Sequence, residues 1–120
     1  MHIVVNLKAY ACDAAAIASA ATEHATVETP VSVVPQAPAI AATAAAGVDT
    51  WAQHIDPIDH GSHTGTVHAT AAAQAGATGT LLNHSERRLK LADIDEAIDA
   101  ACLVGTASTA AASNDRWNTA

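Results

Sequence analysis

The residues best suited to take part in catalysis or binding lie in the segment Gly79–Arg88, which reads GTLLNHSERR. A short apolar run in this segment ends in His84, Ser85 and Glu86, and two arginines follow. In parallel α/β folds the carboxyl ends of the strands carry the working groups, because the loops that follow them converge on one face. His84 is therefore the first candidate for a catalytic residue.

A second polar group follows the apolar run His2–Val5 near the start of the chain. Asn6 and Lys8 stand where a strand over this run would end, so the same rule places the Lys8 ammonium at the carboxyl edge of a sheet. The alternative interpretation is a lysine that only faces solvent, because most lysines in proteins are exposed.

Four of the seven histidines lie in the loop His54–His68. The spacing of His60 and His63 is a weak metal-ligand pattern, and the glycines beside them indicate turns, so we expect no metal site. Cys12 and Cys102 stand alone and far apart in the sequence. We expect both to be free, buried thiols.

The composition limits the classes of partner that the chain can bind. At 120 residues and a formal charge of −7, one acidic domain is expected, which argues against binding to nucleic acid or to an anionic membrane. The sequence has no apolar stretch long enough for a signal peptide or a membrane span, so we expect a cytoplasmic protein. Acidic, lysine-poor composition also suits a salt-adapted, halophilic cytosol.

The elements that must position these residues form a repeating pattern of strand followed by helix, which predicts a parallel sheet. Asp13 is expected to cap the first helix and Gly47 to end the second. The expected strands are His2–Val5, Val31–Val34, Val48–Gln53 and Ala77–Asn83, and the expected helices are Ala14–Ala25, Ala39–Ala46, Thr66–Ala75 and one that begins with a capping-box-like pair, Asp93 and Glu96.

The organisation of the sequence changes after Leu103. Residues 104–120 contain no apolar run from which a fifth buried strand could form, so we expect an irregular, divergent tail there. This change suggests that the reading frame ends unnaturally or that the chain is a fragment.

Five motifs occur in one order along residues 1–103: NLKAY, PQAP, WAQH, HGSHTG and NHSERRLKL. Their ordered combination resembles the triose-phosphate isomerase family, and most closely its compact archaeal branch. The resemblance implies four consecutive βα units of a TIM (β/α)8 barrel, an incomplete half-barrel with parallel strands. It also implies the interconversion of dihydroxyacetone phosphate and glyceraldehyde 3-phosphate in glycolysis and gluconeogenesis, without a cofactor.

The resemblance assigns roles to individual residues. It makes His84 the electrophile that polarises the substrate carbonyl, with a neutral imidazole kept so by a helix that starts near Ser85. It makes Lys8 a catalytic and substrate-binding group beside the phosphate and the developing enediolate, and Asn6 a substrate-binding residue. A structurally hydrogen-bonded His84 remains the alternative.

Two further roles follow from the same resemblance. Ser85 and Glu86 would support the site, although an ion pair of Glu86 with Arg87 or Arg88 is an equally good interpretation. Thr64 would be the reaching residue of a protruding loop that docks into a neighbouring subunit, which implies a homo-oligomer in the full-length family.

The family's proton-transferring base is a glutamate in a Glu-Pro motif, and the sequence contains no Glu-Pro. Triose phosphate is therefore the expected substrate by family, whereas the chain alone is expected to be inactive. The alternative is a non-catalytic half-barrel fragment or an oligomerising module. Open strand edges in such a half-barrel predict instability, aggregation or pairing with another copy.

Overall fold

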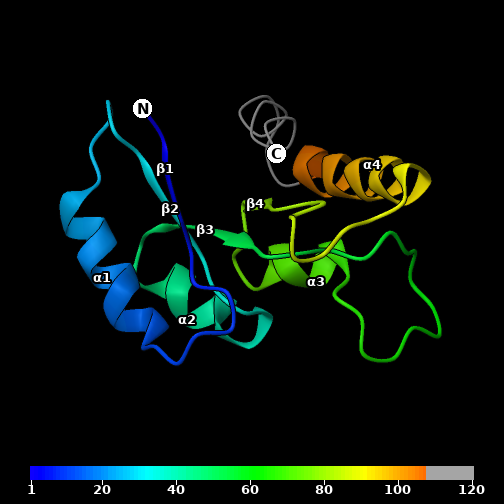
Figure 1. Cartoon of the computed structure of the whole chain (residues 1–120), viewed down its shortest axis with the longest axis horizontal. Coiled ribbons are helices and arrows are strands. Elements are labelled where there is room, and N and C mark those ends of the chain that lie inside the picture. Colours follow the sequence, from blue (N-terminus) through cyan, green and yellow to red (C-terminus); the bar gives the residue numbers. More distant parts are fainter. Residues whose placement is uncertain (108–120) are drawn as a thin grey trace.

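The computed structural model describes residues 1–107, in which four strands form one sheet in the order β1-β2-β3-β4 (Figure 1). All three strand pairs are parallel, and a helix follows each strand. This confirms the expected four βα units. The strands are β1 (Ile3–Asn6), β2 (Val31–Val34), β3 (Asp49–Ala52) and β4 (Gly79–Thr80), and the helices are α1 (Ala14–His24), the 3-10 turn η1 (Ala37–Ala39), α2 (Ile40–Ala45), α3 (Ala69–Gln74) and α4 (Leu91–Ala107).

The predicted boundary signals act as expected around the first two helices. The Asp13 carboxylate accepts a hydrogen bond of 3.0 Å from the backbone N–H of Ala16, which satisfies an amide in the first turn of α1. Gly47 follows α2 with a φ of +88°, a left-handed conformation that glycine adopts without steric cost.

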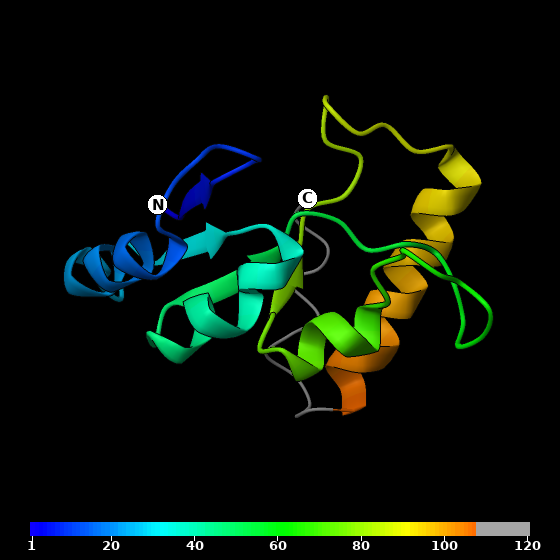
Figure 2. The same cartoon turned by 90° about the horizontal axis from the view of Figure 1, so that it is seen from below.

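Small side chains let the helices approach the sheet closely. Helices α1 and α2 lie together on one face of β1–β3, whereas α3 and α4 pack against each other near β4 (Figures 1 and 2). One core cluster joins Leu7, Ala18, Val33 and Val48, and a second cluster is rich in alanines from α3 and α4. The sheet therefore has one helix-covered face.

The strands β1 and β4 are the two edges of the sheet in the described part of the chain. Val5 packs towards the first core cluster, so Val4 points to the opposite face, where 41% of it is exposed. The exposed valine and the free edge of β1 are the features that a closed barrel would cover.

The fourth unit differs from the expectation. β4 covers two residues instead of Ala77–Asn83. Asn83 has a left-handed φ of +53°, so the extended segment cannot continue past it. No helix begins near Ser85, which corrects that expectation. The side chains of Asn83 and His84 accept hydrogen bonds from the backbone N–H groups of Leu89 and Glu86, respectively, and the chain has no regular secondary structure until α4 begins at Leu91.

Three smaller expectations are also corrected. Asp93 lies inside the first turn of α4 rather than at its cap, and the helix continues past Leu103 to Ala107. Residues 104–107 are therefore helical, with Val104 packed on the core, and the rest of the expected tail, 108–120, lies outside the described residues. Both cysteines are free, but Cys12 is exposed and Cys102 only half-buried. Within residues 1–107 no helix is long and apolar enough to cross a membrane.

Candidate active site

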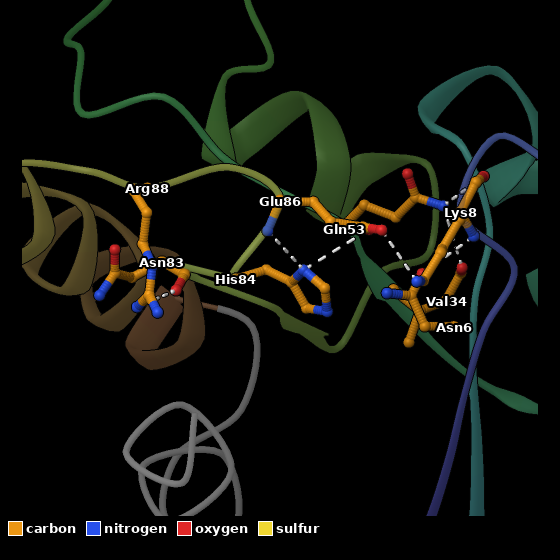
Figure 3. A network of polar contacts seen from close by, with 8 residues as sticks. All are labelled: Asn6, Lys8, Val34, Gln53, Asn83, His84, Glu86 and Arg88. Carbon is orange, nitrogen blue, oxygen red and sulfur yellow. Dashed lines mark hydrogen bonds and ion pairs between the residues drawn. The ribbon is translucent and has the colours of Figure 1, made fainter.

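A cavity of about 480 Å³ opens at the carboxyl ends of the strands. Asn6 and Lys8 reach it from the end of β1, Gln53 from the end of β3, and His84 and Glu86 from the turn after β4 (Figure 3). The fold thus brings together the two segments that the sequence analysis singled out, which lie more than 70 residues apart.

Lys8 and Glu86 form the charged contact of this cavity. The Nζ atom of Lys8 lies 2.9 Å from Oε1 of Glu86. The hydrogen bond that Lys8 donates to Glu86 is the main cause that raises the pKa of Lys8 and lowers the pKa of Glu86, and the opposite charges of the two groups add to both shifts. Both groups are therefore charged at neutral pH, and Glu86 pairs with Lys8 rather than with either neighbouring arginine.

The orientation of His84 is set by its own turn. The Nδ1 atom of His84 accepts a hydrogen bond of 3.2 Å from the backbone N–H of Glu86. Since that nitrogen is an acceptor, the proton of a neutral ring is on Nε2, which can donate to a ligand. The same Nδ1 atom lies 3.7 Å from Oε2 of Glu86. The backbone N–H of Glu86, rather than a helix terminus, therefore orients the ring.

Asp56 is a member of the cavity wall that the sequence analysis did not identify. Its carboxylate lies 2.9 Å from Nε2 of the buried His54, accepts a 2.7 Å hydrogen bond from the backbone N–H of Val67, and lies 3.8 Å from Arg87. Burial raises the pKa of Asp56 as the largest single effect, but the Val67 amide, His54 and Arg87 together outweigh it, so the pKa is lowered overall. Asp56 closes the base of the loop 57–66.

Gln53 was also missed as a site residue, although a signal for it exists. An amide side chain ends or soon follows each of the four strands: Asn6, Gln36, Gln53 and Asn83. Such groups suit strand ends, where backbone carbonyls of neighbouring strands need donors. The motif WAQH contains Gln53, but its spacing alone did not distinguish a site residue from a loop residue.

The remaining candidates lie further out. Thr64 is exposed on the loop 57–66, and its neighbour Gly65 lines the cavity instead. Ser85 is exposed in the turn after His84. In the same loop region the rings of His60 and His68 stack 4.1 Å apart, and residues 1–107 contain no group of three or more potential ligands arranged to hold a metal ion.

The cavity combines the Lys8 ammonium with an imidazole hydrogen-bond donor. Such a pair can bind an anionic ligand and stabilise negative charge that develops on an oxygen. The carboxylates among its lining residues are Glu86 and Asp56, and both are already engaged by cations or donors. Neither is placed as a free base.

Four parallel βα units in chain order, with polar groups at the carboxyl ends of the strands, define the class: this is part of a (β/α)8 barrel. The profile of the triosephosphate isomerase family matches residues 1–112. The chain belongs to the triosephosphate isomerase family.

Individual relatives agree with this assignment. The triosephosphate isomerase of Halobacterium salinarum is 50% identical over 115 residues, which cover 95% of this chain and 54% of the relative. That of Methanosarcina barkeri is 38% identical over 120 residues, covering 93% of this chain and 53% of the relative. The crystal structure of the Bartonella henselae triosephosphate isomerase shares the fold, with a TM-score of 0.76 at 22% identity, over 87% of this chain and 48% of that one. The chain thus spans about half the length of these relatives.

Proposed function

We propose that the chain carries the lysine and histidine portion of a triosephosphate isomerase site and binds a triose phosphate there. The observation that supports this most strongly is the meeting of Lys8, His84 and Glu86 in one cavity from opposite edges of the sheet. Membership of the family alone would not bring these three side chains together in this chain.

Each group has a role that follows from its state. The ring of His84, whose Nδ1 accepts from the backbone, donates from Nε2 to the carbonyl oxygen of the substrate and polarises it. The ammonium of Lys8 stabilises the negative charge that grows on the substrate oxygen while an enediolate forms. It also attracts the phosphate. Asn6 holds Lys8 by accepting a 3.0 Å hydrogen bond from its backbone N–H. Glu86 keeps the ammonium charged and oriented.

The proton transfer between the two substrate carbons needs a base, and residues 1–107 place no free carboxylate in the cavity. The sequence contains no Glu-Pro, and the two carboxylates of the cavity are occupied. Losing a general base costs about two to four orders of magnitude in rate. We therefore infer that the chain alone binds substrate weakly and does not turn it over at a useful rate.

An isomerase assay on the purified chain, coupled to glycerol-phosphate dehydrogenase, tests this proposal. His84→Ala is prepared in parallel, because contaminating host enzyme would give equal rates in both samples. Rates that are equal in the two proteins agree with the proposal. Activity that vanishes in His84→Ala would mean that a base is present among these residues, and the division of roles would be wrong.

A second candidate function is a non-catalytic module that associates through its sheet. The exposed Val4 favours it, as do the edges of β1 and β4, which are unpaired within residues 1–107. Thr64 on its exposed loop fits a contact with a neighbouring subunit, as in the homo-oligomer that the family resemblance implies.

We also propose a cytoplasmic location and adaptation to high salt, which the formal charge of −7 supports.

A further inference from the structure

The side chain of Gln53 joins the ends of three strands. Its Nε2 donates to the backbone carbonyl of Lys8 at 2.8 Å and to that of Val34 at 3.3 Å (Figure 3). Leu7 donates its backbone N–H to the same Val34 carbonyl at 3.0 Å. One amide group from β3 therefore fixes the point where the chain leaves β1 and β2.

The residue that Gln53 holds has an uncommon backbone conformation. Lys8 has a φ of +51°, in the left-handed region that residues with a Cβ rarely occupy. Its N–H is held by the side chain of Asn6, and its carbonyl is held by Gln53. Such a conformation persists only where surrounding contacts over-determine it.

We propose that Gln53 is a positioning residue that locks the Lys8 backbone, so that its ammonium stays on Glu86 at the mouth of the cavity. A glutamine suits this task because its amide offers two N–H donors to two carbonyls, whereas a glutamate or a methionine of similar length offers none. This proposal rests on the proposed function only for the role that the Lys8 ammonium has in the reaction. The contact between Lys8 and Glu86 can be measured without turnover.

Competitive acetylation of the chain, read by mass spectrometry, tests the proposal directly. Lys8 and Lys90 are the only two lysines in the sequence, so exposed Lys90 is an internal reference. In the unaltered chain the raised pKa of Lys8 slows its labelling relative to Lys90. Gln53→Met should raise the Lys8-to-Lys90 labelling ratio about two- to fivefold, as expected for losing an exposed ion pair.

Two matched variants control for other causes. Gln36→Met makes the same exchange in the same cavity, where the Gln36 side chain makes no capping hydrogen bond, and should leave the ratio unchanged. Gly79→Ala disturbs packing against Trp51 at a distance from Lys8 and should also leave it unchanged. Equal increases in Gln53→Met and Gly79→Ala would mean general loosening and would overturn the proposal.

The proposal remains testable if Gln53→Met does not fold, as judged by circular dichroism. Gln53→Asn keeps the donors but is one methylene shorter, so it reaches the two carbonyls poorly and should give an intermediate increase. An unchanged ratio in the folded Gln53 variants would overturn the proposal. A missing isomerase activity would not affect this result, and a failed labelling result would leave the proposed role of Lys8 and His84 standing.

Discussion

At the scale of single residues, the 2.9 Å contact between Lys8 and Glu86 controls two protonation states. Replacing the carboxylate in Glu86→Gln should bring the raised pKa of Lys8 back towards its ordinary 10.5, because the hydrogen bond and the charge that raise it are both removed. A ¹³C NMR titration of the lysine Cε resonances measures this change. Glu96→Gln, on the exposed side of α4, is the matched control. Identical Lys8 titrations in both variants would contradict the assignment of Glu86 as the group that raises the pKa of Lys8.

The same contact predicts how its contribution depends on pH. The pKa of Glu86 is lowered, so its stabilising effect is present above its ordinary pKa of 4.5 and is lost as the pH falls through the lower folded value. The pKa of Lys8 is raised, so its effect is present below 10.5 and is lost as the pH rises through the higher folded value. The difference in stability between the unaltered chain and Glu86→Gln should therefore be constant between about pH 5 and 10 and shrink outside this range. Denaturation curves across pH measure it, and a difference that grows at either extreme would contradict it.

The sequence was most informative for polar side chains that follow strand ends. Lys8, His84 and Glu86 could be placed in one site because polar groups after buried strands meet at one edge. Asp56 and Gln53 could not, since they act through backbone groups of Val67 and Lys8, and such partners leave no pattern in the sequence.

At the scale of elements, Asp56 connects the end of β3 with the far end of the loop 57–66. Asp56→Ala removes the acceptor of the Val67 amide and the partner of His54, which should cost about 1–3 kcal/mol of unfolding free energy. It should also speed amide hydrogen exchange in the loop. Because the pKa of Asp56 is lowered, its contribution is present above about pH 3.8 and is lost as the pH falls through the folded value.

The matched control for this prediction is Asp59→Ala, which removes the same charge from an exposed position in the same loop. Its stability and exchange should stay close to those of the unaltered chain. Equal effects of the two substitutions would show that loop charge, rather than the contacts of Asp56, is responsible.

The strand β4 depends on a glycine for its packing. A Cβ at Gly79 would lie 2.8 Å from Nε1 of Trp51, so Gly79→Ala must displace the indole and should cost about 1–3 kcal/mol. Gly47→Ala meets no atom within 4 Å and should cost only about 1 kcal/mol through its left-handed backbone. Thermal unfolding measures both costs, and a tryptophan fluorescence change should accompany only Gly79→Ala. A Gly79→Ala variant with unchanged thermal stability and fluorescence would contradict the close packing of Gly79 against Trp51.

Element types could be predicted because short apolar runs alternate with alanine-rich segments, but the boundaries of the fourth unit could not. Hydrogen bonds to the side chains of Asn83 and His84 end the extended segment and delay α4 until Leu91. The leucines at 81 and 82 gave no sign of this, since they suit a strand equally well.

At the scale of the whole molecule, the sheet has one covered face and two free edges in the described residues. We expect the isolated chain to associate, because unpaired strand edges and exposed valines offer pairing surfaces. Light scattering should give a mass above the 12.1 kDa of one chain. Val4→Lys on β1 should reduce association, whereas Val27→Lys, exposed in the loop after α1, should not. A stable monomer of the unaltered chain would contradict this expectation.

Our central proposal is that residues 1–107 hold one part of an isomerase site and require a base from residues outside this range. The most direct measurement is co-expression of the chain with the part of the Halobacterium salinarum relative that it does not cover, followed by purification of the complex and an isomerase assay. The account predicts activity in the complex, none in either part alone, and a loss of at least about a hundredfold in His84→Ala. An assembled complex without activity, or activity that survives His84→Ala, would contradict it.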